Sequence, residues 1–339
     1  MDRNEQYYRK TVSSMGFALL IFLGLFELFS LFLQFLLPWI AQLLFPQNAV
    51  AYNLTYELLY ATGYLICFMV PVAFLKLFIK KSGYSYQPMR APLRVSPWLP
   101  LMVLAGITLI FSAAYLNNLF MNFWVGGSTL PDANEESPLA VYEIVLNFLV
   151  ICLVPGFCEE FLFRGAILSN LLPFGRGNAI LISSLLFGLM HRNGSQLFYA
   201  FVAGILLGLI YERTGSIWNC IILHTINNFF STAEALIPFR ILDETLSVAY
   251  AYIFNAILFL AGVVSIVILM LRFFSKSEPK LQDGIYGKSL PACDEYAACP
   301  VAPKRAFRLF LSPSMLVFVS MCMAQILLLM VIVWMGGSF

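Results

Sequence analysis

The sequence predicts an all-α membrane protein, a polytopic transmembrane helical bundle of about nine spans with a cytoplasmic N-terminus. Of the 339 residues, 60% are hydrophobic and only 11% are charged, whereas a soluble domain carries about a quarter charged residues. Apolar runs of about twenty residues, enough to cross ~30 Å of hydrocarbon, recur along the chain. Loops rich and poor in basic residues also alternate. These observations predict a multi-pass protein of the cell membrane.

Nine apolar segments are the predicted spans. They cover residues 15–45, 54–79, 97–123, 139–172, 178–192, 194–212, 216–234, 246–272 and 308–336. The fourth would run about 50 Å as a straight helix, so it must tilt, kink or protrude. Pro155 and Gly156 in its middle predict a kink, because neighbouring helices can satisfy the freed carbonyl. The fifth segment is short for a span.

Lysine and arginine residues set the orientation. Arg3, Arg9 and Lys10 precede the first span, and further basic clusters follow the second and eighth spans. The alternate loops differ, since residues 124–138 carry only acidic charges. Arg192, between the fifth and sixth spans, is the main exception to the pattern. The N-terminus is therefore predicted to be cytoplasmic and the C-terminus to lie outside.

A polar, proline-containing linker at residues 273–307 divides the chain. It separates a main transmembrane bundle, residues 1–272, from a C-terminal transmembrane helix, residues 308–339. Cys293 and Cys299 lie in this linker without a nearby histidine, and their spacing does not match a zinc site. Whether they form a disulfide stays open.

Three charged residues interrupt the fourth span. Glu159, Glu160 and Arg164 lie within the run CEEFLFRG, and together they would cost roughly 9 kcal/mol at the centre of a bilayer. Glu160 and Arg164 are four positions apart, so they share a helix face and can form an ion pair. Glu159 points about 100° away from Glu160. The spacing therefore predicts that Glu160 supports Arg164 while Glu159 faces another partner.

The two histidines of the chain both lie in apolar segments. His191 follows Phe187 by four positions at the end of the fifth segment, and His224 precedes Asn228 by four positions in the seventh. A histidine in a membrane is more often a hydrogen-bonding group between helices, but the nearby carboxylate pair weakens that interpretation. Counted along the helices, Glu159, His191 and His224 can share a cavity in the cytoplasmic half of the bundle.

This set of residues can hydrolyse a peptide bond. Burial makes a carboxylate more basic, so Glu159 is a candidate general base that activates water. A histidine can orient the water or pass its proton to the leaving amine, and Asn228 with His224 can stabilise an oxyanion. A catalytic zinc held by Glu159, His191 and His224 is the alternative. No HExxH motif is present, which favours the mechanism without a cofactor.

The ordered motifs resemble those of the CPBP intramembrane protease family, which includes the type II CAAX prenyl endopeptidases and bacterial Abi-like members. The motifs are Glu159-Glu160-x-x-x-Arg164, Phe187-x-x-x-His191 and His224-x-x-x-Asn228. The resemblance covers residues 139–234 and implies an intramembrane protease core.

By that resemblance, Glu159 is the catalytic base and His191 the histidine that orients water. His224 and Asn228 form the oxyanion or second-histidine pair, and Glu160 and Arg164 hold the site together. The implied activity is endopeptidase cleavage near the membrane, with metal dependence left open.

The expected partners are membrane lipid and a peptide or protein substrate. A nucleic acid is not expected, because the net charge is only +2 and no phosphate-binding motif is present. Two other functions stay open. Intramembrane Glu, Arg and His also occur in proton-coupled transporters, although no internal repeat is visible. A non-catalytic immunity or scaffold protein could bind a peptide in the same cavity.

Overall fold

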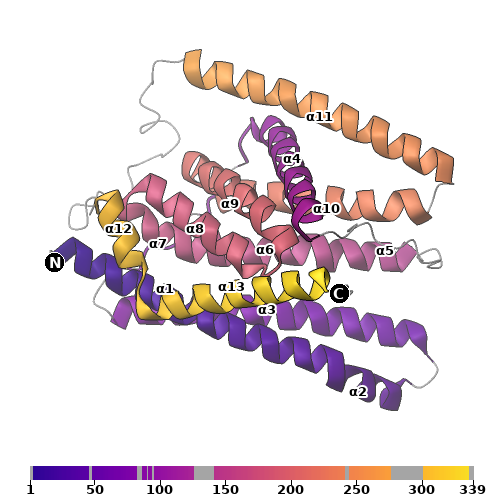
Figure 1. Cartoon of the computed structure of the whole chain (residues 1–339), viewed down its shortest axis with the longest axis horizontal. Helices are drawn as coiled ribbons and strands as arrows, with labels where there is room; N and C mark the ends of the chain where they lie inside the picture. The colour runs from indigo at the N-terminus through magenta and orange to yellow at the C-terminus, as the bar shows by residue number, and fades with distance from the viewer. Residues whose placement is uncertain are drawn as a thin grey trace.

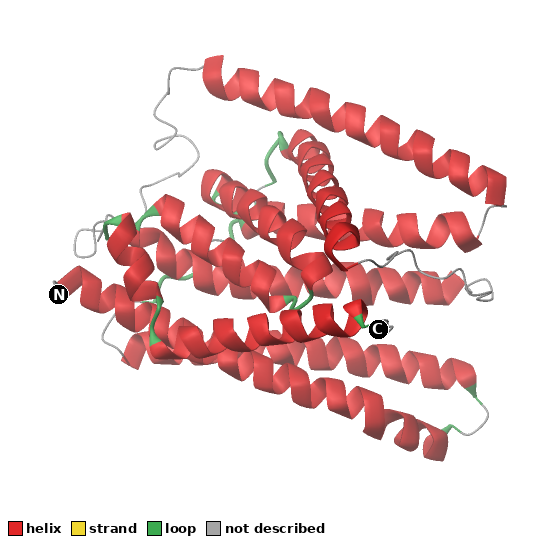
Figure 2. Ribbon diagram, in the orientation of Figure 1, coloured by secondary structure: helices red, strands yellow, loops and turns green. Residues whose placement is uncertain are grey.

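The fold is entirely helical in the part of the chain that the structure describes. This computed structural model describes residues 3–45, 48–81, 86–89, 91–93, 95–125, 141–240, 244–275 and 301–335. Every regular element within these ranges is a helix (Figures 1 and 2). Seven of the helical stretches are long and apolar enough to cross a membrane. The prediction of an all-α, polytopic bundle is therefore confirmed.

The N-terminal helix is longer than its apolar run. It consists of α1 (Arg3–Leu31), the π-helical η1 (Phe32–Leu36) and α2 (Leu37–Leu44), and so begins well before the predicted residue 15. Its polar first turns are covered by the C-terminal part of the chain. Glu5 forms an ion pair with Arg305, and Ser314 Oγ donates to the carbonyl of Ser13 at 2.9 Å. These contacts explain why polar residues continue the helix.

Six further helices coincide with predicted segments to within a few residues at most ends. They are α3 (Ala49–Lys81), α4 (Leu99–Val125), α8 (Arg176–Met190), α9 (Gly194–Thr214), α10 (Ile217–Arg240) and α11 (Glu244–Ser275). Two of them are not among the seven candidate spans. The 15 residues of α8 would reach only about 22 Å, and the side chains of α10 are described only as far as residue 233.

The fourth predicted span contains two π-helical stretches. It runs through α5 (Val141–Asn147), η2 (Phe148–Leu153), α6 (Val154–Glu160), η3 (Phe161–Leu168), α7 (Ser169–Leu171) and η4 (Leu172–Phe174), where η2 and η3 are π-helical. Pro155 lies in the first turn of α6, directly after η2. A proline cannot donate to the preceding turn, and a wider π-helical turn accommodates this loss. The predicted irregularity at Pro155 thus takes the form of a π-helix.

The second π-helix is stabilised by hydroxyl groups. In η3 the carbonyl of Phe163 accepts from Ser183 Oγ of α8 at 3.1 Å. The carbonyl of Arg164 accepts from Ser169 Oγ at 3.0 Å. A π-turn exposes carbonyls that an α-helix would use, and inside a membrane such groups need a partner. Ser183 supplies such a partner directly beside the charged residues, and the Arg164 carbonyl accepts from the Ser169 backbone N–H as well.

Gly156 allows α6 to approach α10 closely. A side chain at this position would collide with the Thr225 side chain of α10. The absence of a Cβ therefore permits contact between the two backbones. This close approach brings the end of α6, which carries Glu159 and Glu160, beside His224.

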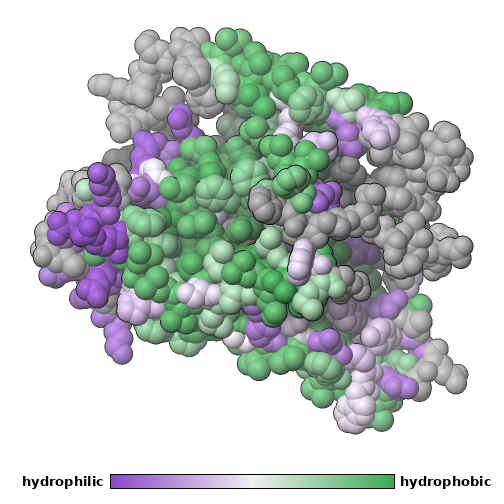
Figure 3. Space-filling view, in the orientation of Figure 1, coloured by the Kyte–Doolittle hydropathy of each residue, from purple (hydrophilic) through white to green (hydrophobic). Residues whose placement is uncertain are grey.

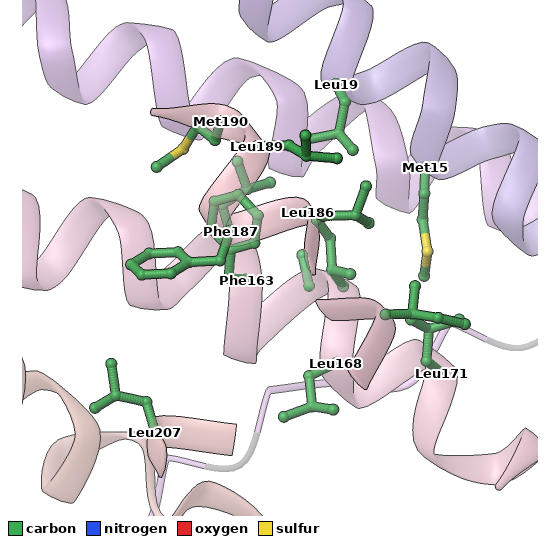
Figure 4. Packing of buried hydrophobic residues seen from close by; sticks show 14 of the residues in the cluster. Met15, Leu19, Phe163, Leu168, Leu171, Leu186, Phe187, Leu189, Met190 and Leu207 are labelled. Carbon is green, nitrogen blue, oxygen red and sulfur yellow. The ribbon is translucent and has the colours of Figure 1, made fainter. Parts of the chain in front are cut away.

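The core of the bundle lies between the N-terminal helix and the helices of the charged segment. Met15 and Leu19 of α1 pack towards Leu171 of α7 and Leu186 of α8 (Figure 4). Along α1 five of the buried residues recur at alternating intervals of four and three, the spacing of a left-handed helix pair. They are Tyr8, Val12, Met15, Leu19 and Phe22. This packing holds α7 and α8 against helices that lie far away in the sequence.

The outer faces of the helices are apolar. Leu28, Phe35 and Leu260 are each more than half exposed, as expected for side chains that contact lipid. Hydrophobic residues cover the sides of the bundle, whereas the densest group of hydrophilic residues lies at the end that carries the N-terminus and α12, with further ones at the opposite end (Figures 1 and 3). This distribution supports insertion in a membrane with that end at a polar surface.

The C-terminal helix is preceded by a short amphipathic helix. α12 (Pro303–Phe310) and α13 (Pro313–Trp334) each begin at a proline, where the fixed φ angle suits a first helical turn. The last predicted span, residues 308–336, therefore divides into two helices. α13 packs against α1 instead of standing apart from the bundle. Most of the predicted linker lies outside the described residues, including Cys293 and Cys299.

Candidate active site

The three charged residues of the fourth span are buried at the junction of α6 and η3. Glu159, Glu160 and Arg164 are 5%, 0% and 1% exposed. Arg164 Nη1 donates to Glu160 Oε1 at 2.8 Å, the contact that their spacing predicts. Arg164 Nη2 also donates to the carbonyl of Gly204 on α9 at 3.2 Å. The ion pair therefore connects the charged segment with α9.

Glu160 has a second partner that the sequence did not indicate. His224 Nδ1 lies 2.8 Å from the same Glu160 Oε1. Because a carboxylate only accepts, Nδ1 carries the hydrogen in this contact. In the neutral ring Nε2 is then unprotonated and can accept a hydrogen bond. Glu160 thus holds both the Arg164 guanidinium and the His224 ring, and it sets the tautomer of that histidine.

Glu159 faces the other side of His224. Its Oε2 lies 3.9 Å from His224 Nε2 and has no hydrogen-bond partner among the described residues. Its Oε1 accepts from Tyr64 Oη of α3 at 2.5 Å. A separation of 3.9 Å is too long for a direct hydrogen bond, but one water molecule could bond both atoms. One carboxylate oxygen is therefore fixed and the other is available for chemistry.

His191 caps the end of α8 and is held by its own helix. Its Nδ1 donates to the carbonyl of Phe187 at 2.8 Å, which leaves Nε2 as the free nitrogen of the neutral ring. The Phe187 ring contacts both histidines edge-on, with centroids 5.1 Å from His191 and 5.9 Å from His224. Its face lies 4.5 Å from the Arg164 guanidinium carbon. Phe187 thus contacts both histidines and packs on the ion pair.

A cavity of about 300 Å³ joins these groups. Glu159, His191, His224 and Asn228, the four predicted catalytic residues, all line it, whereas Glu160 and Arg164 do not. The cavity also reaches Ser231 and Thr232. The structure therefore brings the predicted residues together and places the two support residues behind them.

The cavity extends along α10 away from the N-terminal end of the bundle. α10 starts at that end, because it follows the end of α9. There, Glu212 of α9 forms an ion pair with Arg176 at the start of α8. Arg176 comes shortly after Phe174, whose ring contacts Tyr8 near the N-terminus. Glu159, His191 and His224 all line this cavity, as expected from their positions along the helices. That the cavity lies in the cytoplasmic half stays a prediction.

Sequence reasoning missed Tyr64 and Asn227. Asn227 lines the cavity, is 9% exposed, and has no partner for its Oδ1 among the described residues. The predicted Asn228 makes two long contacts: its Nδ2 lies 3.5 Å from the carbonyl of Ile151, and its Oδ1 accepts from Asn227 Nδ2 at 3.4 Å. Two adjacent amides therefore face the cavity. The Asn-Asn pair was visible in the sequence, but a helix face cannot by itself decide between neighbours.

Tyr64 is the last tyrosine of a regular stack of rings on α3, which continues to Phe68. Tyrosines recur every fourth residue, and each ring centroid lies 5.9–6.5 Å from the next. The members are Tyr52, Tyr56, Tyr60 and Tyr64. This four-residue period indicates in the sequence that the tyrosines share one face of the helix. It does not indicate that this face contacts Glu159.

We expect Tyr64→Phe to lower kcat about tenfold with little change in KM. The variant keeps the ring and its packing but removes the hydrogen bond to Glu159 Oε1, and bonds to charged groups contribute about 1.5–3 kcal/mol. If the site hydrolyses peptides, as the sequence motifs predict, steady-state cleavage by purified protein measures this effect. Tyr60→Phe, one turn earlier in the stack, is the matched control. Equal kcat values for Tyr64→Phe and the parent would show that this contact does not matter.

The donor groups do not form a metal centre as they stand. Within the described ranges, no three His, Cys, Asp or Glu side chains come close enough together to bind one ion. Each histidine donates its Nδ1 hydrogen, to the Phe187 carbonyl and to Glu160 respectively, and keeps an unprotonated Nε2, an arrangement that metal-ligating histidines also show. The zinc alternative therefore stays a prediction.

Comparisons with known proteins agree with the motifs. Residues 141–230 match the family model described as type II CAAX prenyl endopeptidase Rce1-like. A curated relative from Bacillus subtilis (strain 168), named "Putative membrane peptidase YdiL", is 31% identical over 124 residues. That alignment covers 35% of this chain and 50% of the relative, so the chain spans about half the length of the curated relative it matches. No solved structure matches the chain.

Proposed function

We propose that this multi-pass membrane protein is an endopeptidase. The proposal starts from the CPBP intramembrane protease family, which the sequence motifs and the match over residues 141–230 support. The protein would hydrolyse a peptide bond of a membrane-associated protein or peptide with water activated by Glu159. The observation that carries this proposal is the pair of facing atoms Glu159 Oε2 and His224 Nε2, 3.9 Å apart beside a cavity that His191 also lines.

The first step is the attack of water on the substrate carbonyl. Glu159 Oε2 accepts a proton from the water while the water oxygen bonds to the carbonyl carbon. Tyr64 keeps the other carboxylate oxygen in place. His191 Nε2 and His224 Nε2 are the remaining groups that can hold the water in line. The product of this step is a tetrahedral intermediate with a negative oxygen.

The second step breaks the carbon–nitrogen bond. Amide donors of Asn227 or Asn228 stabilise the oxyanion, a type of contact whose loss costs about 3–4 kcal/mol in other proteases. The proton on Glu159 then passes to the leaving amine, and the carboxylate is regenerated. Glu160 keeps Nδ1 of His224 protonated throughout, so Nε2 always faces the reaction.

The surroundings support a substrate that comes from the membrane. Glu159 and both histidines lie on helices of an apolar bundle, and the cavity has polar groups from Glu159 to Thr232. An intramembrane peptide must have its backbone groups satisfied before it can be cleaved, and this polar lining offers partners. The proposal includes membrane lipid as a partner and the cell membrane as the location.

A cleavage assay in the presence of a chelator tests the proposal. Purified protein in lipid bilayers is expected to cleave a membrane-associated test peptide at the same rate with and without EDTA, because Glu159 and the histidines activate water themselves. His191→Ala is expected to lower kcat about 100-fold, within the range for loss of acid–base groups. Mass spectrometry of the new termini gives both rates.

A serine in the first turn of α9 offers the control for this assay. Ser195→Ala removes a hydroxyl that contacts Asn193 without touching the cavity, and should leave the rate within about twofold of the parent. Loss of cleavage in EDTA that added zinc restores would show that the metal-free mechanism is wrong. Unchanged kcat in His191→Ala would remove that residue from the mechanism.

A further inference from the structure

Arg192, directly after His191, has an unusual backbone conformation. Its φ angle is +54°, and no other residue except glycine has a positive φ within the described ranges. This left-handed conformation is easy for glycine and unfavourable for an arginine. The backbone nitrogens of His191 and Arg192 donate to the last turn of α8, to Gly188 at 3.2 Å and Leu189 at 3.1 Å. The turn is therefore tight and begins at the proposed catalytic histidine.

The Arg192 side chain reaches two helices that lie outside the family match. Its Nη1 forms an ion pair with Glu27 of α1 and lies 3.5 Å from Gln325 Oε1 of α13. Gln325 Nε2 in turn donates to Glu27 Oε1 at 2.9 Å. The guanidinium carbon lies 4.9 Å from the centre of the Phe26 ring. We call Arg192, Glu27, Gln325 and Phe26 the arginine clamp.

The clamp also explains the exception in the charge pattern. Arg192 is the basic residue that does not fit the alternation of loop charges. Its side chain is only 16% exposed and is paired with a glutamate, so it is not a free charge at the membrane surface. Placing this charge in the membrane costs free energy, and glycine would adopt the backbone conformation more easily. Both observations indicate that the Arg192 side chain has a function.

We propose that Arg192 is a positioning residue which fixes His191 in the cavity by tying the α8–α9 turn to α1 and α13. Among the described residues, the His191 ring makes one hydrogen bond, to the last turn of its own helix, and helix ends fray unless something holds them. The other side of the turn is already fixed, because Asn193 Oδ1 accepts from Ser195 N at 3.0 Å. The clamp supplies the anchor at Arg192, between these two points.

The inference rests on the proposed function, and it makes the helices beside the protease core part of the site. Residues 141–230 contain Arg192 but neither Glu27 nor Gln325. The core would then need this chain's own N-terminal and C-terminal helices to hold His191 in its working position. A change on α13 would reach the reaction through Arg192 without touching the cavity.

Arg192→Gly separates positioning from folding. Glycine accepts the left-handed conformation, so if Arg192 only completes a turn, the variant should be as stable and as active as the parent. If the clamp positions His191, kcat should fall about tenfold while KM stays within about twofold, because a small misplacement of a catalytic group slows the reaction without weakening binding. Gln325→Ala should lower kcat in the same direction by a smaller factor. Leu328→Ala, an exposed position on α13, is the matched control.

The accessibility of His191 gives a second measurement that needs no substrate. Diethyl pyrocarbonate modifies unprotonated imidazole, and mass spectrometry can follow His191 and His224 separately. In Arg192→Gly the rate at His191 should rise at least about threefold, because the ring is freed from its fixed position. The rate at His224, which Glu160 holds, should stay the same and serves as the internal reference.

The two measurements distinguish failure of the clamp from failure of the proposed function. If the parent cleaves no peptide, the proposed function is wrong, and the labelling ratio alone decides whether the clamp holds His191. If the parent cleaves, a kcat in Arg192→Gly within about twofold of the parent overturns the clamp, as does an unchanged labelling rate at His191. A lower kcat with faster labelling of His191 supports it.

Discussion

Glu159→Gln is expected to lower kcat about a thousandfold while the protein stays folded. The amide has the shape of the carboxylate and can still accept from Tyr64, but it cannot take a proton from water. General-base catalysis contributes typically about 10²–10⁴-fold, so most of the acceleration should be lost. KM should change little, because Glu159 binds water and not the substrate backbone. Single-turnover cleavage with the variant in excess measures the remaining rate.

A second glutamate on an apolar helix provides the control for this variant. Glu57 of α3 lies outside the group that lines the cavity, so Glu57→Gln removes a carboxylate from the membrane region without affecting the proposed chemistry. Its kcat should stay within about twofold of the parent. A Glu159→Gln rate within about tenfold of the parent would mean that another group activates the water.

Arg164→Met is expected to destabilise the folded protein by about 3–5 kcal/mol. The variant keeps most of the side-chain volume but removes the partner of Glu160, whose carboxylate is fully buried. Breaking a buried ion pair from one side leaves an uncompensated charge, which costs about this much. The carbonyl of Gly204 loses a donor as well. Reversible unfolding in mixed micelles, followed by circular dichroism, gives the change in the free energy of unfolding.

The double variant Arg164→Met, Glu160→Gln tests the reason for that loss. If the cost comes from the unpaired Glu160 carboxylate, removing its charge should recover at least about half of the lost stability. His224 would then keep an acceptor for Nδ1 in the amide oxygen that Glu160→Gln introduces. Stability that falls further in the double variant would show that packing of Arg164 on Phe187, and not its charge, is what matters.

Much of the fold was predictable because the membrane limits what a sequence can do. Only helices satisfy their backbone inside a bilayer, so apolar length alone located most spans. The N-terminal helix shows where this fails, since residues 3–14 are polar and helical. Their partners, Arg305 and Ser314, lie at the other end of the chain. No local pattern contains that information.

The sequence predicted which residues form the candidate site better than it predicted their contacts with one another. The spacing of Glu160 and Arg164 was enough to indicate their pairing, because both lie on one short stretch of helix. Which glutamate meets His224 was not decidable, since that depends on how α6 rotates against α10. The π-helices η2 and η3 on either side of α6 change this rotation. They depend on contacts such as that of Ser183 with the Phe163 carbonyl, from a different helix.

The groups that support the site from outside the core could not be inferred. Tyr64 reaches Glu159 from a helix 95 positions earlier, and Gln325 reaches Arg192 from 133 positions later. Tyrosine and glutamine are ordinary residues in such segments, so nothing in their identity indicates these contacts. Asn227 differs, because its neighbour Asn228 was chosen from the same pair. The sequence therefore predicted the face of α10 that lines the cavity, but it identified only Asn228 of the two amides there.

Cleavage of membrane-associated peptides by the purified parent and by Glu159→Gln, compared in the same lipid bilayers, is the most direct test. The account predicts that the parent cuts a single peptide bond in a substrate, with one new amino and one new carboxyl terminus in the mass spectrum, and that Glu159→Gln gives almost no product. Equal cleavage by both proteins would contradict it. So would a parent that cleaves no peptide but moves protons across the bilayer in a way that Glu159→Gln abolishes, because that result would indicate a transporter.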